Sequence, residues 1–247
     1  MELRDRVALV TGGGTGLGRA IARALAREGC HLTIGYSRSE RDAVATVTEL
    51  EALGVRAVAE RADLADPAAC RQLVAATLAH HGRLDVLVNN AGTTVYVPFE
   101  AMDQVTVDDW DRVMAINLRA PWLLAQAAAP ALRQAGGCIL NTASIAGLRA
   151  GGSSIVYCVS KAGLIHLTRC LATALAPAVR VNAIAPGFLR TRWGDAFGEE
   201  TLRAIEQSTL LRRALALEDI AAAALALIRN DAITGQTLVA DGGLVLH

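Results

Sequence analysis

Short apolar runs rich in β-branched residues alternate with longer helical patterns along most of the chain, and this alternation limits the fold more than any other feature. The runs expected to form strands are residues 6–11, 31–36, 55–60, 84–89, 138–142, 179–184 and 237–240. Helical patterns lie near residues 17–29, 39–53, 67–81, 106–133, 155–175 and 217–228. Because strand-helix-strand units cross over in the right-handed sense, this order predicts a parallel sheet with helices on both faces.

Several expected strands, such as VALV at 7–10 and DVLV at 85–88, are nearly unbroken apolar runs, which is typical of strands buried on both faces. No linker divides the chain, so residues 1–247 are expected to form a single doubly wound α/β domain of about seven strands. Residues 187–214 follow an expected strand and contain only a short helical pattern. Such a segment is predicted to be a substrate lid.

The charge balance and the composition of the chain limit the classes of binding partner that are expected. The 24 Lys and Arg residues balance 24 Asp and Glu residues, so no overall field attracts nucleic acid or anionic lipid, and a small-molecule partner is expected. Charges interrupt the apolar runs before membrane-spanning length, and the charged start MELRDR does not fit a signal peptide, which predicts a cytoplasmic protein. The five cysteines form no CxxC and are expected to be reduced core thiols, and the histidines show no metal-ligand spacing.

A glycine-rich turn links the first expected strand to the first expected helix. Such glycines permit a tight turn, let the backbone approach a pyrophosphate and place the anion at the helix N-terminus, as in Rossmann-type sheets. An ordinary strand-to-helix loop is the alternative, but the strand–turn–helix context favours a dinucleotide site. The residues expected to bind it here are Gly12, Gly14, Thr15, Gly16, Leu17 and Gly18.

The end of the second expected strand should decide which dinucleotide binds. An acidic side chain there would bind the ribose 2′-hydroxyl of NAD, whereas this chain has Tyr36, Ser37 and Arg38. A hydroxyl and a guanidinium suit a 2′-phosphate, so we predict NADP(H). NAD(H) stays open, because Arg38 could equally be a solvated residue at a helix start.

Tyr157 and Lys161 are four residues apart in a helical pattern, so their side chains share one face. A nearby ammonium favours the phenolate and is expected to lower the pKa of the phenol, which suits acid–base catalysis. Lys161 is also the only lysine in the chain, which favours a position that needs a compact ammonium over a chance survivor. The alternative is a packed tyrosine beside a snorkelling lysine.

Two more polar residues are expected near this pair. Ser144 follows the expected strand 138–142 and could orient a substrate carbonyl from the sheet side. Asn117 interrupts an apolar helix face, where a buried amide needs partners. Asn117, Ser144, Tyr157 and Lys161 form the predicted catalytic set.

These motifs, with TGxxxGxG from Thr11 to Gly18, Asn89-Asn90-Ala91-Gly92 and Asp241-Gly242-Gly243, resemble the short-chain dehydrogenase/reductase family from Arg6 to Gly243. Within this family, the chain looks most similar to the 3-oxoacyl-carrier-protein reductases and to related alcohol or polyol dehydrogenases. The resemblance implies hydride transfer between NADP(H) and a ketone or secondary alcohol. It implies Tyr157 as general acid/base, Lys161 tuning it and binding the nicotinamide ribose, Ser144 polarising the carbonyl, and Asn117 holding a proton-relay water.

The resemblance also implies further cofactor contacts. The residues concerned, besides Tyr157 and Lys161, are Asp63, Leu64, Asn90, Ala91, Gly92, Pro186, Gly187 and Thr191. Asp63 would meet the adenine amino group unless it caps a helix, for which Asp66 before Pro67 is the better candidate. Thr191 could equally be a surface threonine. Thr15 stands where many NADP-preferring members carry a basic residue, which leaves Arg38 as the main charge partner.

Aromatic residues gather in the loops after the fourth and sixth expected strands, at Tyr96, Phe99, Phe188, Trp193 and Phe197. This clustering indicates either that the aromatic residues contact an apolar part of the substrate or that the lid packs against the core of the protein. The residues taken as substrate contacts are Tyr96, Leu148, Phe188 and Trp193. A carrier-protein substrate would need a basic docking patch, for which the candidates are Arg119, Arg149, Arg190 and Arg192.

The helices expected at 106–133 and 155–175 are apolar over more than one stripe, which predicts a homotetramer or dimer. The apolar end at 244–247 is expected to reach a neighbouring subunit. Two other functions remain open. One is an NAD-dependent polyol or sugar alcohol dehydrogenase, and the other is a catalytically inactive dinucleotide sensor, which would need the glycine turn but not a tuned phenol.

Overall fold

The computed structural model describes residues 1–191 and 198–245. In these residues seven parallel strands form one sheet in the order β3-β2-β1-β4-β5-β6-β7. The strands are β1 (Val7–Thr11), β2 (His31–Tyr36), β3 (Ala57–Arg61), β4 (Val86–Asn89), β5 (Cys138–Thr142), β6 (Arg180–Pro186) and β7 (Thr237–Ala240). The predicted doubly wound, Rossmann-type α/β sheet is confirmed, and the observed strand ends lie within two residues of the expected ones.

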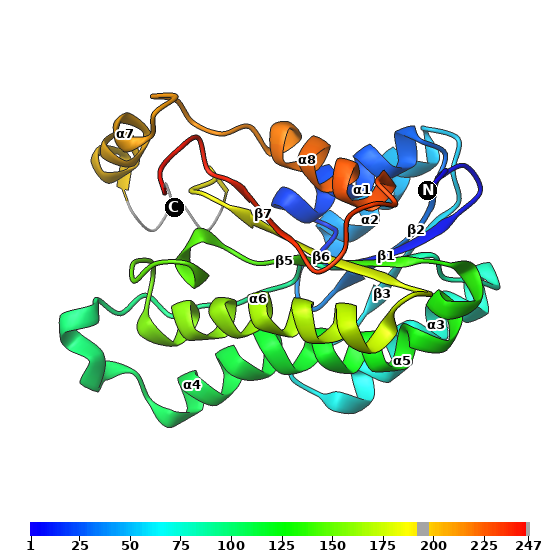
Figure 1. Ribbon diagram of the computed structural model, residues 1–247, viewed down its shortest axis with the longest axis horizontal. Helices are drawn as coiled ribbons and strands as arrows, with labels where there is room; N and C mark the ends of the chain where they lie inside the picture. The colour runs from blue at the N-terminus through cyan, green and yellow to red at the C-terminus, as the bar shows by residue number, and fades with distance from the viewer. Residues whose placement is uncertain (192–197, 246–247) are drawn as a thin grey trace.

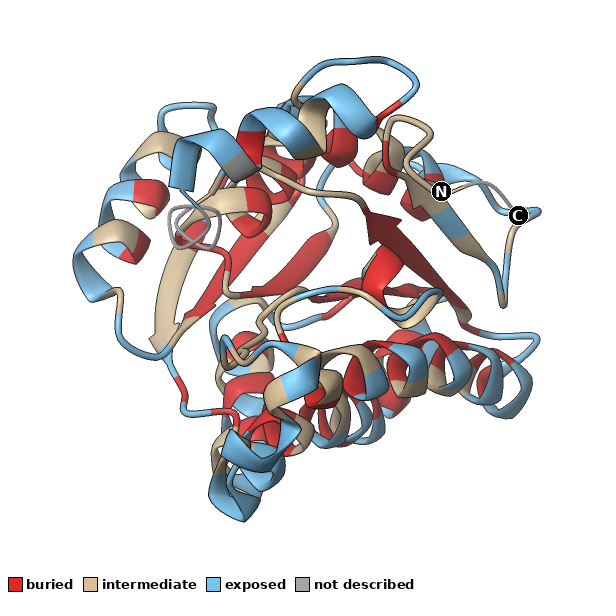
Figure 2. Ribbon diagram, turned by 90° about the vertical axis from the view of Figure 1, so that its left-hand side faces the viewer, coloured by how far each residue is buried: buried red, intermediate tan, exposed pale blue. Residues whose placement is uncertain are grey.

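Helices cover both faces of the sheet (Figure 1). One layer contains α1 (Gly16–Arg27), α2 (Glu40–Glu51) and α8 (Leu217–Arg229), and the other contains α3 (Pro67–His81), α5 (Ala120–Ala135) and α6 (Ile155–Leu175). Figure 2 shows the buried strands between the layers, and the whole of β1 is buried. This two-sided burial explains why its sequence is an unbroken apolar run.

The helix expected at 106–133 consists of three segments. It begins at α4 (Val107–Met114), passes through the π-helical turn η2 (Ala115–Arg119) and continues into α5. Thr106 and Asp109 form a capping box at its start, with Thr106 Oγ1 accepting from Asp109 N at 3.1 Å. Asn117 lies in the π turn, and such turns are frequent at functional sites.

α6 is long and apolar enough to cross a membrane by length and composition alone, a property that core helices of soluble proteins share. In this fold it packs against β5, β6 and α5. The cysteines differ in environment, and all five, which lie in the described residues, are free. Cys30, Cys70 and Cys138 are buried as expected, whereas Cys158 is half-buried and Cys170 is exposed, so the expectation of a core thiol is wrong for Cys170.

The strand order reverses beside β1, and this reversal positions the site. The chain moves outward from β1 through β2 to β3, then returns to add β4 on the other side of β1. The loops after β1 and β4 therefore diverge at the carboxyl edge of the sheet, where open α/β sheets bind ligands.

The described part of the segment predicted as a lid contains α7 (Gly198–Ser208), which lies at the edge of the molecule beside the described end of the chain (Figure 1). Arg190 Nε donates to Glu206 Oε1 at 2.6 Å and so ties α7 to the chain after β6.

Candidate active site

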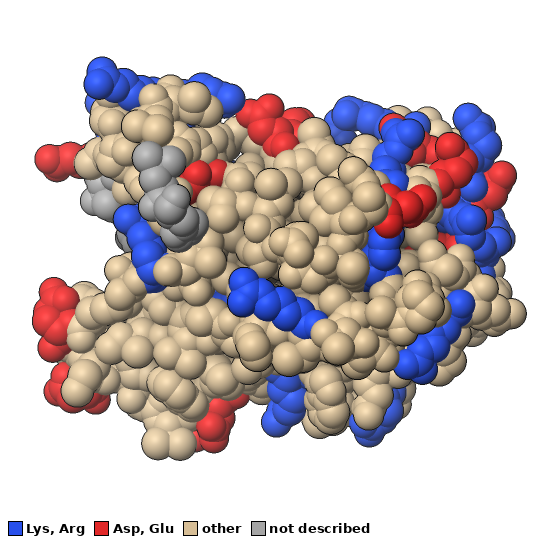
Figure 3. Space-filling model, in the orientation of Figure 1, with Lys and Arg blue, Asp and Glu red and all other residues tan. Residues whose placement is uncertain are grey.

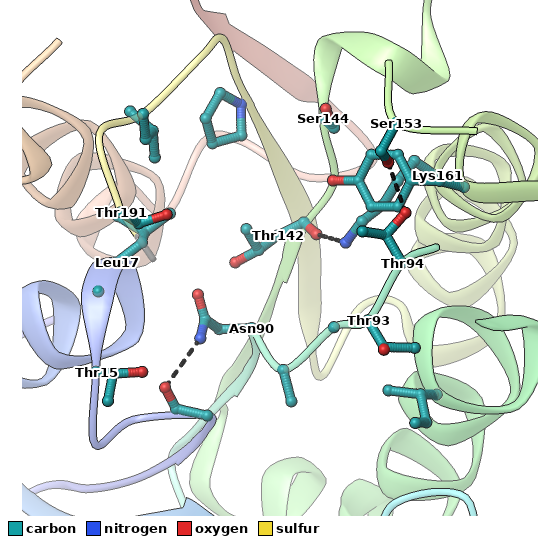
Figure 4. A pocket seen from close by; sticks show the side chains of 18 of the residues that line it. Thr15, Leu17, Asn90, Thr93, Thr94, Thr142, Ser144, Ser153, Lys161 and Thr191 are labelled. Carbon is teal, nitrogen blue, oxygen red and sulfur yellow. Dashed lines mark hydrogen bonds between the residues drawn. The ribbon is translucent and has the colours of Figure 1, made fainter. Parts of the chain in front are cut away.

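A cavity of about 1100 Å³ opens at the carboxyl edge of the sheet. The loops after β1, β4, β5 and β6 line it, together with parts of α4, α6 and α7 (Figure 4). The predicted cofactor residues on its wall are Gly12, Gly14, Thr15, Gly16, Leu17, Tyr36, Ser37, Arg38, Asp63, Leu64, Asn90, Ala91, Gly92, Pro186, Gly187 and Thr191. This single cavity therefore brings together residues that are distant in the sequence.

The glycine turn after β1 leaves no room for side chains. Gly12 has a φ of +63°, and a Cβ on it would lie 3.1 Å from Ala91 Cα. Gly18 does not line the cavity; a Cβ there would collide with the carbonyl oxygen of Gly12 and the amide of Asn90. Gly18 is thus needed for close packing behind the turn.

The N-terminus of α1 fits an anionic group. Among the described residues, Thr15 makes no side-chain cap to this helix, and the first turn carries no acidic residue. The N–H groups of that turn therefore face the cavity wall without a competing carboxylate, as a bound pyrophosphate would require. These features make the turn compatible with a dinucleotide.

Asn90 and Thr11 join the loops after β1 and β4. Asn90 Nδ2 donates to Thr11 O at 2.9 Å, and Thr11 Oγ1 accepts from the N–H groups of Asn90 and Ala91, each at 3.0 Å. These bonds fix the two loops relative to each other at the point where they separate.

Polar groups from β2 and α2 surround the other end of the cavity. Ser37 and Arg38 are exposed on its wall, with no acidic side chain at the last residue of β2. Tyr36 is half-buried, and its hydroxyl is hydrogen-bonded to Glu40; burial, followed by the charge of Glu40, raises the pKa of Tyr36. Arg19 also lines this region, but its guanidinium is paired with Glu49.

Asp63 and Asp66 were the two candidates for capping α3, and Asp63 was also expected to contact the adenine. Asp66 Oδ1 accepts from Ala68 N at 2.8 Å and caps α3, which confirms it as the better cap candidate. Asp63 lies on the cavity wall, and its carboxylate accepts from Ala65 N at 3.1 Å.

The cavity brings Ser144, Tyr157 and Lys161 together. The hydroxyls of Tyr157 and Ser144 are hydrogen-bonded, which joins the first turn of α6 to the end of β5. Lys161 is 3% exposed, and its Nζ donates to Thr142 O at 2.7 Å and lies 5.7 Å from the centre of the Tyr157 ring. Ser154 Oγ caps α6 by accepting from Tyr157 N at 3.3 Å, so the helix start fixes the position of the tyrosine.

Burial dominates the acid–base properties of this group. It raises the pKa of Tyr157 to about 12, although the hydrogen bond from Ser144 acts in the opposite direction. Burial also lowers the pKa of Lys161 to about 8. The expectation of a lowered phenol pKa is therefore wrong: burial outweighs the hydrogen bond from Ser144, and the Lys161 ammonium is hydrogen-bonded to Thr142 O. Tyr157 keeps its proton at neutral pH.

Asn117 lies behind the cavity wall and is 1% exposed. Its Oδ1 accepts from Thr93 N at 2.8 Å, and its Nδ2 donates to Thr93 O at 2.9 Å and to Ser160 Oγ at 3.0 Å. These contacts occupy both amide protons, and the relay water that the resemblance implies stays a prediction. The amide instead ties the loop after β4 to α6.

Only some of the residues expected to contact the substrate line the cavity. Tyr96 and Phe188 line the cavity, whereas Leu148, although described, does not. Leu148 packs against the small core cluster around Ile165, because the turn after Ser144 directs it toward the sheet. Trp193, with the neighbouring Arg192 and Phe197, lies outside the described residues.

Several lining residues were not foreseen from the sequence. Thr94, Ser153 and Arg112 are on the wall, as is Leu244, which contributes to the cavity of its own chain. Thr94 is the second residue after the Asn-Asn-Ala-Gly motif, and that position is a signal that could have been used. Ser153 and Leu244 carry no comparable signal, because only the tertiary fold brings them to this edge.

Comparisons with known proteins agree with this geometry. A family model described as Enoyl-(Acyl carrier protein) reductase matches residues 12–245. A short chain dehydrogenase from Burkholderia cenocepacia, whose crystal structure is in complex with NADP, has a TM-score of 0.92 at 37% identity and covers 99% of each chain. The chain belongs to the short-chain dehydrogenase/reductase family. It is therefore a member of a family of oxidoreductases.

Two curated members of the short-chain dehydrogenase/reductase family are similar over nearly their full length. The granaticin polyketide synthase putative ketoacyl reductase 2 of Streptomyces violaceoruber is 42% identical over 96% of this chain and 95% of that protein. The 3-oxoacyl-[acyl-carrier-protein] reductase FabG of Staphylococcus aureus is 37% identical over 97% of this chain and 98% of that protein. The resemblance to reductases of this kind is confirmed.

Proposed function

We propose that the protein transfers a hydride between NADP(H) and a ketone or secondary alcohol, with Tyr157 as the general acid/base. The observation that carries the proposal is the hydrogen-bonded pair of Tyr157 and Ser144 on the wall of the cavity that also contains the glycine turn. A carbonyl oxygen placed between these two hydroxyls would accept a hydrogen bond from each. Developing negative charge on that oxygen would then meet two oriented donors.

Each residue of the set has a task in this proposal. NADPH, when bound along the cavity wall, would supply the hydride for the carbonyl carbon. Tyr157 donates its proton to the carbonyl oxygen in reduction and takes it back in oxidation, and its raised pKa keeps the proton in place until then. Ser144 orients the carbonyl, and Lys161 provides the positive charge that stabilises the phenolate as it forms and binds the nicotinamide ribose.

Asn117 is proposed as a positioning residue. It does not touch the cavity, but it fixes Thr93 on the wall and Ser160 in the turn of α6 between Tyr157 and Lys161. The hydroxyl of Ser160 in turn donates to Tyr157 O at 2.7 Å. Its loss is expected to affect catalysis through the placement of Tyr157.

NADP(H) is preferred over NAD(H) in this proposal. The wall near the 2′ position carries Ser37 and Arg38, and the relative from Burkholderia cenocepacia binds NADP. The remaining predicted cofactor residues are proposed to contact the same dinucleotide from the walls where they lie.

The charge around the cavity favours a free small-molecule substrate over a carrier-bound one. The lip formed by η1 (Phe99–Gln104) and α4 is acidic, as Figure 3 shows at the lower left. Its acidic residues are Glu100, Asp103, Asp108, Asp109 and Asp111. Among the basic candidates that the structure describes, Arg119 Nη2 donates to Ala65 O at 2.7 Å and Arg190 is paired with Glu206 and Glu199, which leaves Arg149 on the cavity wall.

The proposal includes a single functional domain over residues 1–247, whose lid at about 187–214 closes over the substrate, in a cytoplasmic homo-oligomer. The decisive experiment follows the oxidation of NADPH with a panel of small ketones. Tyr157→Phe is expected to lose about 100-fold or more in turnover while still binding NADPH, because it removes the proton and little else. Normal turnover by this variant would refute the assignment, and an enzyme that binds NADPH but reduces no ketone would support the sensor alternative.

A further inference from the structure

Two hydroxyl groups are in contact on the wall of the cavity that contains the proposed catalytic set. Thr94 Oγ1 lies 2.5 Å from Ser153 Oγ, and both residues line the cavity (Figure 4). Thr94 belongs to the loop after β4, and Ser153 belongs to the loop before α6. The pair therefore joins the two segments that border the position of the substrate.

The backbone around this pair holds both hydroxyls in place. Val97 N donates to Ser153 O at 2.9 Å, a second link between the same two loops. Ser153 directly precedes Ser154, the buried N-cap of α6. On the other loop, Asn117 is hydrogen-bonded to both the main-chain N–H and the main-chain carbonyl of Thr93, the residue before Thr94. Hydrogen bonds therefore fix the backbone on which both hydroxyls stand, and a specific binding group requires such a fixed position.

The pair lies next to Tyr157. Gly152, which precedes Ser153, packs against the ring, since a Cβ on Gly152 would be 3.8 Å from Tyr157 Cδ1. All four residues line the same cavity, so a small ketone held by the Tyr157 and Ser144 hydroxyls would lie in the space that the Thr94–Ser153 pair borders.

Proton counting shows what the pair offers to a ligand. Thr94 Oγ1 donates its one proton to Val95 O at 3.1 Å. In the contact between the two hydroxyls either atom could be the donor, and when Thr94 donates to Val95 O it is Ser153 that donates to Thr94. In either arrangement Ser153 Oγ keeps a lone pair, so it can act as a hydrogen-bond acceptor on the cavity wall.

We propose that the Thr94–Ser153 pair binds a hydroxyl group on the carbon next to the reacting carbonyl, so that the substrates are α-hydroxy ketones and the corresponding vicinal diols. This inference rests on the proposed function. A substrate O–H can donate to Ser153 Oγ, whereas a methylene at the same place leaves that oxygen without a partner.

A matched pair of substrates tests the inference. Hydroxyacetone and butanone have the same number of heavy atoms and differ only by a hydroxyl in place of a methyl group. The ratio of their kcat/KM values, measured from NADPH oxidation, is expected to favour hydroxyacetone by about tenfold or more in the unaltered protein. Ser153→Ala should bring this ratio close to one, because it removes the acceptor that distinguishes the two ketones.

Two further variants separate binding from a structural role. Thr94→Val keeps the shape but takes away the acceptor for the Ser153 proton, so it should also lower the ratio. Ser208→Ala is the control, since Ser208 lines the same cavity but donates its proton to Ile205 O at 2.6 Å. Its ratio should equal that of the unaltered protein.

The outcomes distinguish this inference from the proposed function. If butanone is reduced as efficiently as hydroxyacetone, or if Ser153→Ala slows both substrates equally, the hydroxyl pair is only a structural link and the inference is wrong while the proposed function stands. If the unaltered protein reduces neither these two ketones nor any other ketone of the panel, the proposed function itself fails. A ratio that changes in Ser153→Ala and Thr94→Val, but not in Ser208→Ala, supports the inference.

Discussion

Lys161 Nζ and the main-chain carbonyl of Thr142 are joined by a hydrogen bond of 2.7 Å, which links the buried face of α6 to the end of β5. The acceptor is neutral, so it does not compensate the charge of the ammonium, and burial lowers the pKa of Lys161 to about 8. A compact ammonium fits this buried contact, whereas the larger planar guanidinium would need more room at the same position. This explains why a chain that otherwise uses Arg has its one lysine here.

The pH dependence of ketone reduction is the first prediction. Lys161 loses its charge as the pH rises through about 8, and the phenolate formed by proton donation from Tyr157 then loses its stabilising neighbour. The kcat/KM for reduction should therefore fall above about pH 8. Lys161→Arg, which stays charged, should be slower overall but should lack this decline. The same decline in Lys161→Arg would assign it to another group.

Periodicity was sufficient to predict the fold, because strands buried on both faces need apolar runs and the runs define the sheet. The glycine turn and the Tyr157–Lys161 spacing were equally readable, since both depend on neighbours within a few residues. Leu148 was misassigned because the direction of a side chain in an irregular turn is not encoded in any period. The raised pKa of Tyr157 and its bond to Ser144 depend on burial between β5 and α6, which only the tertiary structure reveals.

Cofactor preference gives the second prediction. Arg38→Ala removes the exposed guanidinium on the cavity wall and should lower kcat/KM for NADPH by about 10- to 100-fold, the typical effect of losing a hydrogen bond to a charged group. The value for NADH should change little, because NADH has no 2′-phosphate. Arg41→Ala is the control, since Arg41 is exposed on α2 but does not line the cavity. Equal losses with both cofactors in Arg38→Ala would exclude a 2′-phosphate contact.

Stability in acid is the third prediction, and it concerns Asp85. The side chain of Asp85 is 0% exposed, and it accepts from Arg6 Nη1 at 2.8 Å, from Arg83 Nε at 2.8 Å and from Val7 N at 2.9 Å. Burial alone would raise the pKa of this carboxyl, but the hydrogen bonds from Arg83, Val7 and Arg6 outweigh it and lower the pKa.

Because the folded pKa of Asp85 lies below its ordinary value, its contribution to stability is complete above about pH 4 and is lost as the pH falls further. Asp85→Asn should cost about 3–5 kcal/mol in the free energy of unfolding near neutral pH, since it breaks a buried ion pair. The control is Asp231→Asn, because Asp231 also pairs with an arginine but is 71% exposed, and it should cost less than about 1 kcal/mol. Urea titrations measure both values, and similar losses would contradict the role of burial.

The fourth prediction concerns self-association through α5 and α6. Trp122 on α5 is 45% exposed and Val159 on α6 is 41% exposed, and Figure 3 shows few charged side chains over α6. A groove of about 310 Å³ runs beside Trp122 between the two helices. An exposed apolar surface of this kind favours association with a second copy of the chain. Trp122→Glu should therefore lower the molar mass measured by light scattering, because it places a charge in that interface. Val44→Glu changes an equally exposed apolar residue on α2, across the sheet, and should leave the mass unchanged. A monomeric unaltered protein, or the same mass for both variants, would show that these helices are not the interface.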